Sequence, residues 1–199
     1  MSETYPVFLR FEGRLAVLVG GGRVAAAKLS GLLAAGARVR VVAPGVAPEI
    51  ERPEIEIRRR AFVPEDLDGA FFVVAAAPPE VNRNVRLAAD ARGLFVNAVD
   101  DAKSASAFLG GVVRKGGVTV AVATDGRAPA LAGLLREALE RVLPDDISAW
   151  VDLGERVRAG WRETGIPMGD RRPLLLRALL DLYPQVDPAT QPQPREVQP

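Results

Sequence analysis

Short, unbroken runs of apolar residues recur along the first hundred residues and alternate with segments of helical periodicity. The apolar run 15–19 ends at three glycines and has the pattern of a buried parallel strand. Residues 24–35 follow with leucines on one helical face, and Gly36 supplies a stop. Four more strands and a second helix are predicted, the strands at 38–43, 55–57, 70–77 and 94–99 and the helix at 79–92.

Strands that alternate with helices at this spacing predict βαβ units, and therefore an α/β fold with a Rossmann-like parallel sheet. The rest of the chain differs, because residues 108–123 predict a β-hairpin that turns at Arg114-Lys115-Gly116-Gly117. A helix follows from Pro129 and ends before Pro144, and two more are expected at 147–161 and 174–183. We expect four parts: a Rossmann-like domain at 1–110, a hairpin and helix region at 111–145, a small helical C-terminal domain at 146–184, and a disordered tail at 185–199.

The charge balance limits the class of partner. The 199 residues include 26 Lys+Arg and 25 Asp+Glu, a net charge of +1, which argues against a dedicated nucleic-acid binder. The hydrophobic fraction of 48% is that of a globular protein and argues against wholesale disorder. No apolar run reaches the roughly 20 residues that span a bilayer, and the N-terminus lacks a signal-peptide pattern, so we expect a cytoplasmic protein without membrane contact.

Two missing residue types limit the chemistry. The chain has no Cys, which excludes disulfides, thiolate catalysis and Cys-ligated metal centres. It also has no His, the commonest general base and the commonest transition-metal ligand, and we predict no metal site. Any acid–base step must therefore use Asp, Glu, Lys or Tyr.

The strongest local motif is the G-x-G-x-x-A of residues 20–25, which follows the first strand and opens the first helix. Gly20 permits a tight turn, Gly22 lets the backbone approach a pyrophosphate, and Ala25 allows close packing of helix on sheet. The start of a helix also offers unpaired N–H groups to phosphates. The motif predicts dinucleotide binding, and a purely structural turn is the alternative.

One element of that motif is absent. An acidic residue commonly ends the second strand and binds the adenosine ribose, but Val42-Ala43-Pro44-Gly45 stands at that place. Arg38 and Arg40 lie nearby and either favour a 2′-phosphate or are simply solvated. The residues alone do not decide between NAD and NADP.

Two further segments could carry chemistry. Asp100 follows the fifth strand, and ligands of open α/β sheets lie outside the carboxyl ends of strands, so without His it is the best-placed general base. The alternative is that Asp100 or Asp101 caps a turn. Later in the chain, Thr124 and Arg127 precede a helix start and could receive an anionic group, or form a plain entry loop.

The order of these motifs resembles the NAD-binding domain of siroheme synthase, which is the precorrin-2 dehydrogenase family, over about residues 5–145. The segments that carry the resemblance are Tyr5-Pro6-Val7, 18–25 with Lys28, 36–37, 41–44, 97–100 and 126–131. The resemblance implies oxidation of precorrin-2, a reduced tetrapyrrole with eight carboxylates, to sirohydrochlorin with NAD+ as hydride acceptor. It also implies a homodimer built through residues 111–145, so that this region is the dimerisation region.

The resemblance also assigns residue roles. It implies a catalytic aspartate at Asp100 and a hydroxyl near the substrate entrance at Thr124, while Asp125 departs from the glycine that is common there. Lys103, Arg127 and Arg136 are candidates for binding the substrate carboxylates. The implied NAD contacts, together with the glycine motif, are Gly20, Gly21, Gly22, Arg23, Val24, Pro44 and Gly45.

Two other functions fit the same residues. The first is a bifunctional enzyme that also inserts Fe2+ into sirohydrochlorin, as some members of the family do, with Asp100 as base for both reactions. The second is an NAD(H)-sensing Rossmann dimer without catalysis, which would share the glycine motif and the helical C-terminal part. A sensor has no need of a carboxylate beside the nicotinamide, so Asp100 separates it from the enzymes.

Overall fold

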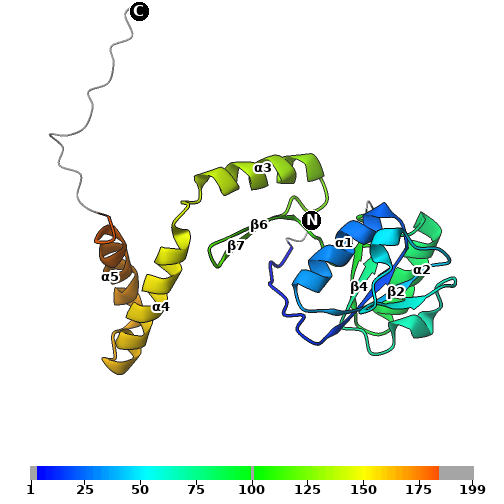
Figure 1. Ribbon diagram of the computed structural model, residues 1–199, viewed down its shortest axis with the longest axis horizontal. Helices are drawn as coiled ribbons and strands as arrows, with labels where there is room; N and C mark the ends of the chain where they lie inside the picture. Colours follow the sequence, from blue (N-terminus) through cyan, green and yellow to red (C-terminus); the bar gives the residue numbers. More distant parts are fainter. Residues whose placement is uncertain (1–3, 100, 184–199) are drawn as a thin grey trace, which may run out of the picture. The chain divides into compact units, whose positions relative to one another are not determined.

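The computed structural model describes residues 4–99 and 101–183 (Figure 1). The chain divides into two compact units, the first comprising residues 1–111 and 122–134 and the second 112–121 and 135–199. Among the described residues, none of the helices is both long enough and apolar enough to cross a membrane.

The first unit is built on a five-stranded parallel sheet with the order β3-β2-β1-β4-β5. Its strands are β1 (Leu15–Val19), β2 (Arg38–Val42), β3 (Glu56–Arg58), β4 (Phe72–Ala75) and β5 (Phe95–Ala98). After β3 the chain crosses to the other side of β1, and the strand order therefore reverses between β1 and β4. In open α/β sheets a ligand-binding crevice forms at this point. The predicted α/β class and the parallel sheet are confirmed.

Helices cover both faces of this sheet. α1 (Arg23–Ala34) buries Ala25, Leu29 and Leu32 in one core cluster, and α2 (Pro79–Asp90) buries Val85, Ala88 and Ala89 in the other. Residues of β1 alternate between the two clusters, with Leu18 on the α1 side and Val17 and Val19 on the α2 side. A strand buried on both faces needs apolar residues at every position, which explains the continuous run 15–19. Two short 3-10 helices also lie in this unit, η1 (Pro48–Ile50) and η2 (Pro64–Leu67).

Strands β6 (Gly111–Lys115) and β7 (Val118–Val122) form the predicted hairpin, most of which belongs to the second unit. The predicted turn is too long, because Arg114 and Lys115 belong to β6 and only Gly116 and Gly117 turn. Their φ angles of +52° and +82° suit a two-residue turn, in which both residues need positive φ. The Lys115 Nζ donates to the Leu143 carbonyl at 2.8 Å and to Asp145 at 2.7 Å.

Three helices complete the described chain: α3 (Pro129–Val142), α4 (Ile147–Glu163) and α5 (Met168–Leu180). α5 begins at Met168, six residues before the predicted start, since it accommodates Pro173 at the loss of one backbone N–H donor. Trp150 Nε1 donates to the Tyr183 hydroxyl at 2.5 Å, which donates to Asp146 at 2.8 Å, so the segment after α5 is fixed to the start of α4. The predicted tail at 185–199 lies outside the described residues.

Candidate active site

The glycine motif forms a tight loop between β1 and α1. Gly20 has a φ of +128°, and a Cβ there would overlap the carbonyl oxygen of Ala76 at the end of β4. A Cβ on Gly21 would overlap the carbonyl oxygen of Gly45, whereas a Cβ on Gly22 would meet nothing within 4 Å. The loop is therefore packed closely at its first two glycines and open at the third.

The open position lies at the start of α1. Gly22 is the N-cap residue, and no side chain caps this end of the helix. The first N–H groups of a helix lack intrahelical partners, so those of Arg23 and Val24 are available to a ligand, and the helix dipole favours an anion there. Open space beside unpaired N–H groups fits a dinucleotide pyrophosphate.

The segment after β2 forms the other wall of this site. The Ala47 N–H donates to the Gly21 carbonyl at 2.7 Å, and the Gly20 N–H donates to the Val42 carbonyl at 3.0 Å. A pocket of about 400 Å³ lies between the two loops, and its lining includes Pro44 and Gly45, the two residues of this segment that are predicted to contact the cofactor. The remaining lining residues are Val19, Gly20, Gly21, Gly22, Val42, Ala43, Ala61, Phe62, Ala76, Ala77, Pro78 and Val81, none of them charged.

The arginines considered for a 2′-phosphate are engaged elsewhere. Arg38 Nε donates to the Gly13 carbonyl at 3.1 Å. Arg40 donates to Glu56 at 2.9 Å and to the backbone carbonyl of Asp66 at 2.9 Å. Neither residue lines the cofactor pocket, so the structure gives no support to a role for them in 2′-phosphate binding.

Asp100 lies outside the described residues. Before it, the Val99 N–H donates to the Ala75 carbonyl at 2.9 Å and extends the pairing of β5 with β4. After it, Asp101 accepts the Ser104 N–H at 3.2 Å, and hydrogen bonds from the hydroxyl and N–H of Ser104 lower the pKa of Asp101. Asp101 therefore caps a turn, the role that was considered for either aspartate.

The loop before α3 packs against the segment that follows Asp101. A Cβ on Gly126 would lie 3.3 Å from the Ala102 Cβ, close to ordinary contact. The Thr124 hydroxyl accepts the Ala128 N–H at 3.2 Å and so fixes the entry to α3. Asp125 adopts a φ of +51°, a conformation that glycine adopts more readily, and its carboxylate accepts the Thr4 hydroxyl at 2.5 Å.

The predicted substrate-binding cations have different surroundings. Lys103 and Arg127 are exposed, and they lie in the two segments that Gly126 and Ala102 bring together. Arg136 belongs to the second unit, and its guanidinium pairs with Glu140 at 2.9 Å and Glu137 at 3.3 Å. The structure therefore places two of the three cations on neighbouring segments.

Sequence reasoning missed an ion cluster around the buried carboxylate of Asp66. Asp66 is fully buried, and its carboxylate accepts Arg60 at 2.6 and 2.7 Å, Arg58 at 2.7 Å and the Val63 N–H at 3.0 Å. Burial alone would raise the pKa of Asp66, but the hydrogen bonds from Arg60, Val63 and Arg58 lower it to about 2. Arg58 is partly exposed and Arg60 is exposed, so only the carboxylate of the cluster is buried, and no local signal in the sequence marks Asp66 as buried.

Comparisons with known proteins cover both units. A family model described as "Putative NAD(P)-binding" matches residues 7–111. The chain is 40% identical to siroheme synthase of Photorhabdus laumondii over 163 residues, 79% of this chain and 34% of that one. It is 43% identical to siroheme synthase of Chromobacterium violaceum over 147 residues, 71% of this chain and 31% of that one.

The chain thus spans about a third of the length of these curated relatives. A solved structure of comparable size is also similar, that of SirC, precorrin-2 dehydrogenase. The TM-score is 0.72 at 27% sequence identity, and the match covers 90% of this chain and 92% of that one.

Proposed function

Because the chain belongs to the NAD(P)-binding family that its residues 7–111 match, we propose that it is a precorrin-2 dehydrogenase that oxidises precorrin-2 to sirohydrochlorin with NAD+. The observation that carries the proposal is the similarity to SirC over 90% of the chain. A dinucleotide-binding domain alone would account for the first unit only. The identity of about 40% to siroheme synthases supports the same reaction.

The first unit binds the cofactor in this proposal. NAD+, when bound, supplies the hydride acceptor for the reaction. The N–H groups of Arg23 and Val24 at the start of α1 donate to the pyrophosphate, and Gly22 leaves room for it. Pro44 and Gly45 line the pocket where an acidic residue would otherwise bind the ribose, so the ribose contacts there are made by the backbone.

Asp100 is the proposed catalytic base. The oxidation removes one hydride and one proton from precorrin-2, and a carboxylate that follows the carboxyl end of β5 suits the proton. The chain has no His, and the neighbouring Asp101 is engaged in its turn with Ser104. Asp100 therefore accepts the proton and passes it to solvent, while the hydride leaves to the cofactor.

The eight carboxylates of precorrin-2 need cations at the rim of the site. Lys103 and Arg127 are exposed and lie on packed neighbouring segments, and we assign them to this rim together with the Thr124 hydroxyl at the entrance. Arg136 pairs with Glu140, also on α3, at 2.9 Å. It would have to release Glu140 in order to bind a substrate carboxylate. Charge-assisted pairs of this kind orient an anionic substrate.

We also propose a homodimer. α3 exposes Leu131, Leu134, Leu135 and Val142, and Leu134 and Val142 are 65% and 77% exposed in the single chain. A contiguous apolar face of this kind commonly marks a protein interface. A second copy of the chain is the occupant we propose, through residues 111–145. The cytoplasmic location and an additional iron-insertion activity stay predictions.

Anaerobic incubation of the protein with precorrin-2 and NAD+, and in parallel with NADP+, tests the proposed function. Sirohydrochlorin, followed by its absorbance, is expected to form rapidly with NAD+. Binding of NAD+ without any product would contradict the enzyme and favour an NAD(H)-responsive dimer. Iron addition to the product mixture then tests metal insertion.

A further inference from the structure

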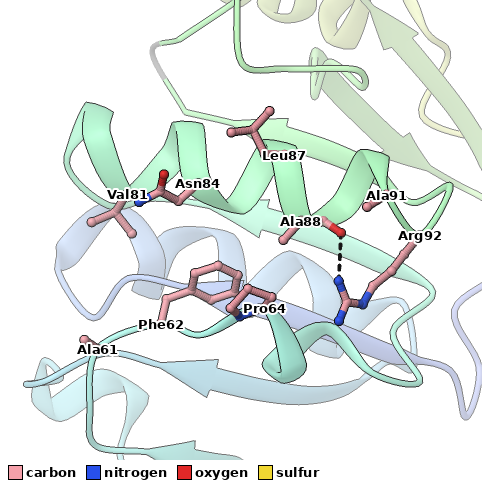
Figure 2. A pocket seen from close by; sticks show the side chains of 9 residues that line it. All are labelled: Ala61, Phe62, Pro64, Val81, Asn84, Leu87, Ala88, Ala91 and Arg92. Atoms are coloured by element: carbon pink, nitrogen blue, oxygen red, sulfur yellow. Dashed lines mark hydrogen bonds between the residues drawn. The ribbon is translucent and has the colours of Figure 1, made fainter.

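Two pockets of the first unit meet at Phe62. The first is the cofactor pocket, and the second, of about 670 Å³, runs along α2. Ala61, Phe62 and Val81 line both pockets. Figure 2 shows Val81 and Ala88 on the α2 side of the second pocket and the ring of Phe62 on the facing segment. Phe62 therefore marks the boundary between the cofactor pocket and the groove beside α2.

This boundary lies on the adenosine side of the cofactor pocket. In dinucleotide-binding folds the end of the second strand contacts the adenosine ribose, and here Phe62 follows β3, which pairs with β2 on the side away from β1. The lining has no charged side chain, so its side chains offer a base mostly apolar surface. A flat base is stabilised by contact with an aromatic ring and an aliphatic side chain.

Taking NAD+ as the cofactor from the proposed function, we propose that Phe62 and Val81 form the walls of the adenine subsite. We further propose that buried Asp66 is a positioning residue, which holds Phe62 at this subsite through Arg60 and Val63.

The position of Phe62 is fixed by hydrogen bonds that involve the residues immediately before and after it. Arg60 Nη1 donates to the Ala61 carbonyl at 3.0 Å and to Asp66 at 2.7 Å. On the other side, the Val63 N–H donates to the Asp66 carboxylate at 3.0 Å. The residues immediately before and after Phe62 are thus tied to one carboxylate. A buried carboxylate is costly unless it is paired, so its ion pairs are expected to persist in the folded protein.

Calorimetric titration with three ligands tests this assignment. NAD+ and ADP-ribose carry the adenine, whereas nicotinamide mononucleotide lacks it. Phe62→Ala and Asp66→Asn are expected to weaken NAD+ and ADP-ribose binding by about tenfold and to change nicotinamide mononucleotide binding by less than about twofold. A general loss of structure would weaken the binding of all three ligands alike.

Two matched variants serve as controls. Asp68→Asn makes the same chemical change two residues away, at an exposed carboxylate that pairs with Arg92 at 3.0 Å. Phe95→Ala removes the same ring from the start of β5, where Phe95 is 58% exposed. Both are expected to bind all three ligands as the wild type does.

Two more variants guard against unfolding. Phe62→Leu keeps apolar volume, and Arg60→Gln removes the contact to Ala61 from an exposed residue; each is expected to show the same selective loss. Equal weakening of all three ligands, or unchanged NAD+ binding in folded variants, would overturn the subsite. If the wild-type protein binds no NAD+, both the proposed dehydrogenase function and the proposed adenine subsite are overturned. If it binds NAD+ without turnover, only the proposed dehydrogenase function is overturned.

Discussion

The N–H of Ala47 donates to the carbonyl oxygen of Gly21 at 2.7 Å, and this hydrogen bond joins the segment after β2 to the glycine loop after β1. The same two segments touch again where a Cβ on Gly21 would overlap the Gly45 carbonyl. The floor of the cofactor pocket therefore depends on a close approach of two backbones. Gly22, one residue later, takes no part in that approach.

This difference gives opposite expectations for two glycine substitutions. Gly21→Ala should lower the free energy of unfolding by about 1–3 kcal/mol, because the segment at Gly45 must move. Gly22→Ala should lower it by less than about 1 kcal/mol, since its Cβ meets no neighbour, yet it should weaken NAD+ binding by filling the space for the pyrophosphate. Urea denaturation and calorimetry measure the two effects. A Gly22→Ala protein with wild-type affinity for NAD+ would remove the pyrophosphate from that position.

Asp66 should make stability depend on pH in acid. Its pKa in the folded protein, about 2, lies below the ordinary value of 3.8. The stabilisation is therefore fully present above pH 4 and is lost as the pH falls toward 2, and it amounts to about 2 kcal/mol. Denaturant titrations from pH 5 to pH 2 should show a steeper loss of stability in the wild type than in Asp66→Asn. Parallel curves for the two proteins would contradict the ion cluster.

The two adjacent aspartates should separate catalysis from turn formation. Asp100→Ala is expected to bind NAD+ like the wild type and to lose turnover by about a hundredfold or more, as is usual when a general base is removed. Asp101→Asn is expected to lower stability only slightly through its turn with Ser104 and to keep most of its turnover. Steady-state rates and NAD+ titrations distinguish them. Full turnover in Asp100→Ala would exclude it as the base.

The exposed face of α3 predicts a concentration-dependent dimer. Leu134→Glu places a charge at a residue that is 65% exposed in the single chain, and should leave the fold intact while shifting the protein toward the monomer. Leu176→Glu on α5, where the leucine is 59% exposed, is the matched control and should stay dimeric. Sedimentation velocity measures both masses. A wild type that is monomeric at micromolar concentration would contradict the dimer.

Features encoded by neighbouring residues could be predicted from the sequence. The run 15–19 and the glycines after it specify a strand, a turn and a helix start within eleven residues. The structure places all three there, with β1 at Leu15–Val19 and α1 from Arg23. Because a glycine motif between a strand and a helix start offers unpaired N–H groups to phosphates, the place of the cofactor pocket followed from residues 20–25.

Features that depend on burial could not be predicted in this way. Asp66 and Arg60 are six residues apart, and both have side chains that are usually solvated, so nothing in their spacing indicates that Asp66 is buried and paired with Arg60. Lys115 resembles a turn residue in the sequence, but it ends β6, and its side chain bonds to Leu143 and Asp145, 28 and 30 residues away. Phe62 is one aromatic residue among 7 phenylalanines, and only the folded chain brings it to the pocket.

The most direct test of the dehydrogenase is the stoichiometry of its products. Anaerobic incubation with limiting precorrin-2 and excess NAD+ should give equal amounts of sirohydrochlorin and NADH, with none of either when NAD+ or the protein is left out. Sirohydrochlorin formed at the same rate without NAD+, or NAD+ left unreduced while bound to the protein, would contradict the proposed function.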